Sequence, residues 1–183
     1  MFILYAIPIG IALGYLLGGR IDRLSELRLR WAPLMLLGLA LQVALFSAPV
    51  GDVVGDAGPP IYVTSTAAVL IAVVRNIYIR GIAIVALGAA SNLLAILANA
   101  GYMPADPAAL ASIGGAAPGY SNSSVVADPM LKPLTDIFAL PAWVPFANVF
   151  SVGDVLIGMG VAVTIVVAMR TGRPPADHGG EAQ

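Results

Sequence analysis

The chain has 183 residues, of which 59% are hydrophobic and only 10% are charged, and its mean hydropathy is +0.91. About a quarter of the residues of a soluble domain are charged, so this composition is typical of an integral membrane protein. The net charge of −1 and the dispersed basic residues exclude nucleic acid as an expected partner. The chain has no cysteine, so a metal site would need carboxylates alone; we expect no metal and no cofactor.

Five apolar stretches follow one another, each about long enough to cross a hydrocarbon core of roughly 30 Å. They cover residues 2–19, 32–50, 61–79, 81–100 and 149–169, and Arg75 interrupts the third. We predict an all-α fold, a polytopic membrane helix bundle with about five transmembrane helices in a single domain over residues 1–170. The first stretch has no basic residues before it and no small-residue cleavage site after it, so we expect a retained helix.

Basic residues fall in alternate connections between these stretches. Four arginines separate the first two stretches, Arg75 and Arg80 lie at the turn from the third to the fourth, and two arginines follow the fifth. Cytoplasmic loops carry the excess of Lys and Arg, which predicts an outer N-terminus and an inner C-terminus in a bacterial inner or plasma membrane. Segment 51–60 and the loop 101–147 then lie outside. The polar tail 171–183 is predicted to be disordered and cytoplasmic.

Two features of the first 31 residues suggest partners for the chain. Gly10, Gly14 and Gly18 form a doubled G-x-x-x-G stripe, which lets another helix backbone approach closely. We expect that stripe to pack inside the bundle, with a homodimer through the same glycines as the alternative. Segment 20–31 alternates arginines with apolar residues at helical spacing, which suits either a helix lying on anionic membrane lipid or an ordinary cytoplasmic loop.

Two aspartates bracket an apolar segment just before the last stretch. Asp136 and Asp154 are separated by a linker in which Pro141 and Pro145 prevent one continuous helix, so the linker could fold one carboxyl toward the other. Two close, partly desolvated carboxyls share a proton and can activate a water, which is the chemistry of an aspartyl hydrolase.

Each aspartate also has a structural interpretation. Ser151 and Asp154 have the spacing of a capping box at the start of the last helix, where the charge of Asp154 suits the helix dipole. Thr135 and Asp136 could open a short interfacial helix, or Asp136 could be an exposed loop carboxylate without a specific role.

The spacing of several residues resembles lipoprotein signal peptidase (signal peptidase II). Asp154 is followed by an Ile and a Gly three and six positions on, Leu134-Thr135-Asp136-Ile137-Phe138 is similar to the motif of the family's other aspartate, and Gly88-Ala-Ala-Ser-Asn92 looks like part of a third motif. The resemblance covers residues 32–169 at most. It implies that Asp136 and Asp154 are catalytic and that Asn92, Asn148 and Ser151 bind substrate. Ala95 and Ile96 stand where that family has an Asp-Arg pair.

The chain as a whole more closely resembles an uncharacterised family of bacterial integral membrane proteins, a domain of unknown function. The shared signatures are Asn99-x-Gly-x-Met-Pro104 and Ser151-x-Gly-Asp154.

Three functions follow as hypotheses. The first is a membrane protein of unassigned activity with a signal peptidase II-like scaffold, which binds membrane lipid, a membrane-anchored protein or a larger membrane complex. The second is an intramembrane aspartyl hydrolase that acts at the outer face on a lipid-anchored substrate. The third is a small transporter, although ionisable groups away from the ends of the apolar stretches, which transport usually requires, are missing.

Overall fold

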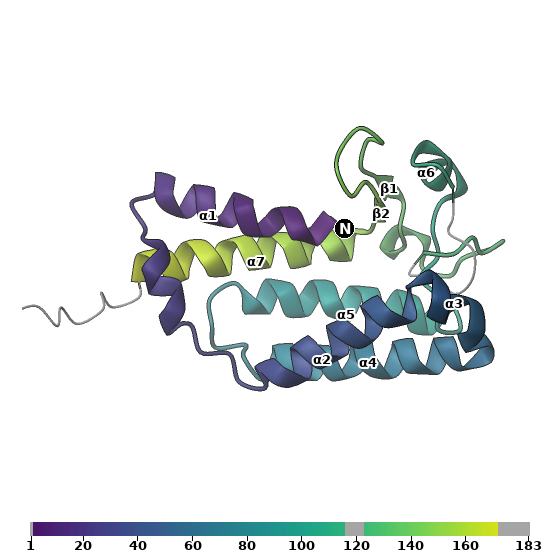
Figure 1. The fold of residues 1–183 in the computed structure, drawn as a ribbon, viewed down its shortest axis with the longest axis horizontal. Helices are drawn as coiled ribbons and strands as arrows, with labels where there is room; N and C mark the ends of the chain where they lie inside the picture. Colours follow the sequence, from purple (N-terminus) through teal and green to yellow (C-terminus); the bar gives the residue numbers. More distant parts are fainter. Residues whose placement is uncertain (1, 116–122, 172–183) are drawn as a thin grey trace, which may run out of the picture.

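The computed structural model describes residues 2–115 and 123–171, and this part of the chain is mostly helical (Figure 1). Its α-helices are α1 (Ala6–Leu16), α2 (Ala32–Leu45), α3 (Ala48–Val54), α4 (Gly58–Val74), α5 (Ile82–Ala98), α6 (Pro107–Ser112) and α7 (Val152–Thr171). Short 3-10 helices are η1 (Phe2–Tyr5), η2 (Ile21–Glu26), η3 (Gly55–Ala57) and η4 (Lys132–Leu134). A two-stranded antiparallel hairpin, β1 (Phe138–Ala139) and β2 (Val149–Phe150), departs from the all-α expectation. The tail prediction falls almost entirely on residues outside the described ranges.

The five longer helices correspond to the five predicted stretches, but their bounds differ. The stretch predicted at 32–50 ends as α2 at Leu45, because Ser47 is extended and α3 begins beside Pro49. The stretch predicted at 61–79 begins earlier, at Gly58, since prolines are tolerated in the first helical turn. It ends at Val74, so Arg75 is an exposed C-cap residue instead of an interruption.

Two helical stretches in the described residues are long and apolar enough to cross a membrane, judged by length and composition alone. They are Pro49–Val74, which runs through α3 and α4, and Val152–Thr171, which is α7. The other three long helices, α1, α2 and α5, are apolar but have 11, 14 and 17 residues.

The long helices pack as a row in the order α1, α7, α5, α4, α2 (Figure 1). α7 lies between α1 and α5, and α4 lies between α5 and α2. Small residues make this row possible: a Cβ added to Gly88 of α5 would lie 2.4 Å from the Gly153 carbonyl oxygen of α7.

The glycine stripe of α1 packs inside the protein at two of its three predicted positions. A Cβ on Gly10 would lie 3.1 Å from Ala162 Cα, and one on Gly14 would lie 2.4 Å from the Met169 sulfur. Gly18 was predicted wrongly: it is exposed, has φ +76°, and has no heavy atom near its missing Cβ. Gly19 takes its place against Met169. A homodimer through α1 stays a prediction.

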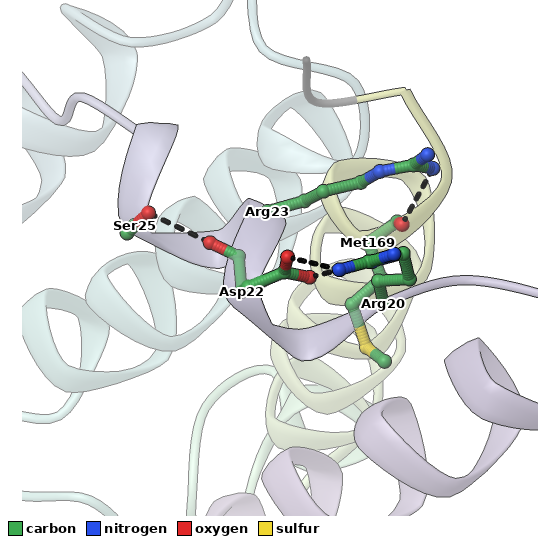
Figure 2. Close-up of polar contacts among 5 residues, drawn as sticks. All are labelled: Arg20, Asp22, Arg23, Ser25 and Met169. Atoms are coloured by element: carbon green, nitrogen blue, oxygen red, sulfur yellow. Dashed lines mark hydrogen bonds and ion pairs between the residues drawn. The ribbon is translucent and has the colours of Figure 1, made fainter. Parts of the chain in front are cut away.

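The basic connections meet at one end of the row, at the left in Figure 1. The N–H of Arg20 donates to the Met169 carbonyl at 2.9 Å, and the Arg23 guanidinium donates to the Arg170 carbonyl at 2.8 Å. The Arg23 guanidinium also donates to the Met169 carbonyl at 3.3 Å (Figure 2). A cation on the last carbonyls of α7 complements the negative end of that helix. Arg20 also forms an ion pair with Asp22 at 2.9 Å (Figure 2).

The opposite end of the row is covered by α3, α6 and the β hairpin (Figure 1). The described residues of the predicted loop 101–147 are therefore largely folded. Its anchor is Asn99, which is buried and whose side chain exchanges two hydrogen bonds with the backbone of Met130, at 2.9 and 3.0 Å. Pro104 and Ala105 form isolated β-bridges with Ser124 and Asp136, which places these distant segments side by side.

Candidate functional site

A closed ring of hydrogen bonds joins α5 to the first turn of α7. The Ser151 hydroxyl donates to Asn92 Oδ1 at 2.8 Å, and Asn92 Nδ2 donates to Asp154 Oδ1 at 2.9 Å. The Asp154 N–H donates back to Ser151 Oγ at 3.0 Å, and the Ser151 N–H donates to Asp154 Oδ2 at 3.1 Å. The last two bonds are the reciprocal pair of a capping box. The structural interpretation of Ser151 and Asp154 is therefore confirmed, and Asn92 extends it to a second helix.

Two glycines allow this ring to close. A Cβ on Gly153 would lie 1.9 Å from Asn92 Oδ1, so any larger residue there would displace the Asn92 side chain. A Cβ on Gly88, one helical turn before Asn92, would lie 2.8 Å from the Ile157 nitrogen. The glycines of the two sequence motifs therefore bring the backbones of α5 and α7 together at this point.

Asp136 lies at the same end of the protein, in the part of the chain around α6 and the β hairpin that covers the end of the helix row. Only 3% of its surface is exposed. Its N–H donates to the Pro104 carbonyl at 2.9 Å, and its carbonyl accepts from the Asp106 N–H at 2.9 Å. The buried hydroxyl of Ser123 donates to its Oδ2 at 2.6 Å. Asp136 is therefore neither an exposed loop carboxylate nor the start of a helix, because η4 ends before it at Leu134.

The β hairpin turns the chain back between the two aspartates, as the prolines of the linker predicted. Phe138 pairs with Phe150, and their rings stack with centroids 5.5 Å apart. Asp136 precedes the first strand by two residues, and α7 begins two residues after the second.

The ionisation of Asp136 is strongly perturbed. Burial raises the pKa of this carboxyl from 3.8 to about 7, the Ser123 hydrogen bond opposes that rise, and the charge of Asp154 adds to it. The two carboxyls therefore interact electrostatically. Their surroundings differ: each oxygen of Asp154 accepts an N–H hydrogen bond, whereas Asp136 is desolvated by burial.

The remaining predicted site residue, Asn148, does not join this group. Its Nδ2 donates to the Val149 carbonyl at 2.7 Å, and its buried Oδ1 has no hydrogen-bond partner among the described residues. Ser123, in contrast, contacts Asp136 but was missed from the sequence. Ser123 lies 13 positions before Asp136 and belongs to no recognisable motif. Its contact with Asp136 depends on how the segments that cover this end of the helix row fold together.

An apolar groove of about 420 Å³ opens between α2 and α4. Its lining is Leu34, Leu37, Gly38, Leu41, Pro60, Ile61, Thr64, Ser65 and Ala68. The resemblance to signal peptidase II suggests a cleft that reaches the aspartates, but this groove contains none of the predicted site residues. Among residues 2–115 and 123–171, no three His, Cys, Asp or Glu side chains gather in a metal-binding group.

Comparison with known proteins gives a family without an activity. A family model described as "Family of unknown function (DUF5317)" matches residues 26–166. No curated protein and no solved structure matches the chain. The resemblance to signal peptidase II therefore rests on the motifs around Asn92, Asp136 and Asp154 alone.

Proposed function

The chain belongs to the DUF5317 family of unknown function, and we propose that it is an integral membrane protein with an aspartyl hydrolase site at the outer membrane face. The observation that carries the activity is the contrast between Asp136 and Asp154. Asp136 is buried, and its pKa of about 7 is raised in part by the charge of Asp154, whose carboxylate accepts bonds from two N–H groups. One acid and one base in different environments are what acid–base hydrolysis near neutral pH requires.

The proposal of five membrane spans is supported by the surfaces of the helices. α1, α2, α4 and α5 contain no charged residue, and many of their large apolar side chains are exposed, including Leu16, Leu36 and Leu87, which are 81%, 67% and 62% exposed. Such surfaces suit lipid. The basic connections at one end of the row and the carboxylate pair at the other fit an inner and an outer face.

We propose a lipid-anchored molecule as the substrate because the site lies next to the apolar β hairpin. The turn of the β hairpin carries Trp143 and Phe146, which are 84% and 75% exposed, and residues 137–153 include no charged side chain. Exposed aromatic side chains of this kind favour the headgroup region of a membrane. A substrate held by its lipid anchor would meet Asp136 and Asp154 at that level.

A second candidate function, a non-catalytic lipid-binding protein or a subunit of a membrane complex, is favoured by one observation. The hydrogen bonds of Asp154 complete a helix cap, and Asp136 is bonded to Ser123 and almost fully buried. Both carboxylates therefore have structural partners already.

The experiment that separates the two functions compares Asp136→Asn and Asp154→Asn with Asp128→Asn, a matched change at an exposed aspartate. Each variant is expressed in cells that lack the wild-type protein. The processing of lipid-anchored membrane proteins is then followed by mass spectrometry. Both site variants should lose processing while they accumulate in the membrane like the wild type, and Asp128→Asn should retain it. Unchanged processing in both site variants would leave the non-catalytic function.

A further inference from the structure

We propose that Ser123 is a positioning residue that fixes the proton of Asp136 on Oδ1, so that Asp136 is the acid of the pair and Asp154 the base. This inference rests on the proposed function and deepens it, since it assigns the two carboxyls unequal roles. It also includes a residue that lies outside every motif found in the sequence.

The assignment of Asp154 as the base follows from its donors. Oδ1 accepts the Asn92 amide and Oδ2 accepts the Ser151 N–H, so each oxygen faces a fixed donor that cannot turn around. The Asn92 amide is oriented by the Ser151 hydroxyl that donates to its oxygen. Each oxygen of this carboxylate retains a lone pair with which to accept a proton.

The assignment of Asp136 as the acid follows from its burial and from the direction of one bond. The Ser123 hydroxyl lies 2.6 Å from Oδ2, and its hydrogen can be donated to that oxygen. Oδ1 accepts no hydrogen bond from the described residues, so a proton on Oδ1 keeps the Ser123 bond intact. A proton on Oδ2 would compete with the Ser123 hydrogen for the same region.

The charged groups on the elements around Asp136 leave Asp154 as its main electrostatic partner. Asp106 lies beside it in the backbone bridge, but the Asp106 carboxylate caps α6 by accepting from the N–H groups of Ala108 and Ala109. Lys132, on η4, is exposed. Asp154, on α7, is the charged residue whose field raises the pKa of Asp136.

The proposed hydrolysis of an amide balances with these roles. Asp154 takes a proton from water as the water oxygen bonds to the substrate carbonyl carbon, and Asp136 gives its Oδ1 proton to the carbonyl oxygen. Asp154 then gives its proton to the leaving nitrogen as the carbon–nitrogen bond breaks. Asp136 regains a proton from a hydroxyl of the tetrahedral intermediate, so both carboxyls return to their starting states.

The test is an infrared titration of the purified full-length protein in lipid nanodiscs. It follows the carbonyl band of protonated carboxyls with pH and identifies the Asp136 contribution by its loss in Asp136→Asn. The wild-type band should titrate near pH 7. Ser123→Ala should move the midpoint upward by about one pH unit, because a hydrogen bond to the charged form is lost. Ser123→Thr, which keeps the hydroxyl, should restore the midpoint, and Asp128→Asn should leave it unchanged.

The outcomes separate this inference from the proposed hydrolase. An Asp136 midpoint near 4, or one that Ser123→Ala leaves in place, overturns the role of Ser123 whether or not the protein cleaves a substrate. If the titration shifts as expected but processing is unchanged in the Asp136→Asn and Asp154→Asn cells, the proposed hydrolase is wrong. The role of Ser123 in positioning the Asp136 proton is then still supported.

Discussion

Asn92 Nδ2 lies 2.9 Å from Asp154 Oδ1, so a helix cap of α7 is completed by a side chain from α5. A capping box usually closes within one helix. Here the Ser151 hydroxyl donates to Asn92 at 2.8 Å, and the start of α7 and the C-terminal half of α5 therefore become one hydrogen-bonded unit.

Replacing Asn92 tests this unit. Asn92→Ala leaves the Ser151 hydroxyl and one oxygen of Asp154 without their partner, so the free energy of unfolding should fall by about 1–3 kcal/mol. Thermal unfolding in detergent measures the change. Ser91→Ala is the matched control, since the neighbouring Ser91 hydroxyl makes no hydrogen bond in the described part of the chain. Equal losses in the two variants would contradict a special role for Asn92.

Gly153→Ala should be destabilising because of Asn92. The new methyl group would lie 1.9 Å from Asn92 Oδ1, and overpacking of this kind typically costs about 1–3 kcal/mol. In the Asn92→Ala background the nearest obstacle is gone and only the Gly88 carbonyl oxygen, 2.8 Å from the new methyl group, remains, so the added cost of Gly153→Ala should shrink. A double-mutant cycle of unfolding free energies measures the coupling, and additive effects would show that the backbone, not Asn92, is what requires glycine.

Stability should depend on pH through Asp136. Its folded pKa of about 7 is above the 3.8 of an unperturbed carboxyl, so between these values the folded chain holds a proton that the unfolded chain has lost. The free energy of unfolding should therefore be greatest below pH 4 and fall as the pH rises to about 7, by up to about 4 kcal/mol from this group. Asp136→Asn should flatten that fall. Urea unfolding at several pH values measures it, and a wild-type curve parallel to the variant's would refute the assignment.

Arg23 should stabilise the end of α7. Arg23→Gln removes a charged donor from the Met169 and Arg170 carbonyls, so we expect a loss of about 1 kcal/mol in unfolding free energy. Arg28→Gln is the control, because Arg28 is exposed and makes no ion pair or hydrogen bond in the described structure. If the two variants lose the same unfolding free energy, the loss comes from the removal of a positive charge at this end of the protein and not from the Arg23 hydrogen bonds.

The proposed orientation can be tested by labelling, since the chain contains no cysteine. Ser25→Cys lies in η2 at the basic end, and Ala142→Cys lies in the exposed hairpin turn. In intact cells, a membrane-impermeant maleimide should label Ala142→Cys and should label Ser25→Cys only after the cells are opened. The reverse pattern would invert the orientation and place the aspartates inside.

Local sequence patterns predicted the parts of the site that depend on single helices. The small residues before Asn92 and the Ser151–Asp154 spacing indicated close helix contact and a cap, and both are present. The position of Asp136 depends instead on a backbone bridge to Ala105, 31 positions earlier. Such pairing between distant segments leaves no periodic pattern, and Ser123 was missed for the same reason.

The order in which the helices pack side by side could not be predicted from the sequence either. Continuous apolar stretches located the helices, but a stretch that is apolar on every side carries little information about which neighbour the helix prefers. Close approach depends on where a glycine faces a backbone, as Gly81 does at the Gly160 carbonyl oxygen, 2.6 Å from its missing Cβ. The same limit explains Gly18, whose spacing matches Gly10 and Gly14 but which lies past the end of α1 at Leu16.

The packing of α1 on α7 sets the order in which the protein can be assembled during synthesis. The first long helix finds its main partner in the last, which is separated from it by some 135 residues of chain. At a translation rate of about 5–20 residues per second, α1 waits on the order of ten seconds without that partner. During this interval its small-residue face, Gly10 and Gly14, lacks the partner that covers it in the folded protein and is available to other helices until α7 emerges.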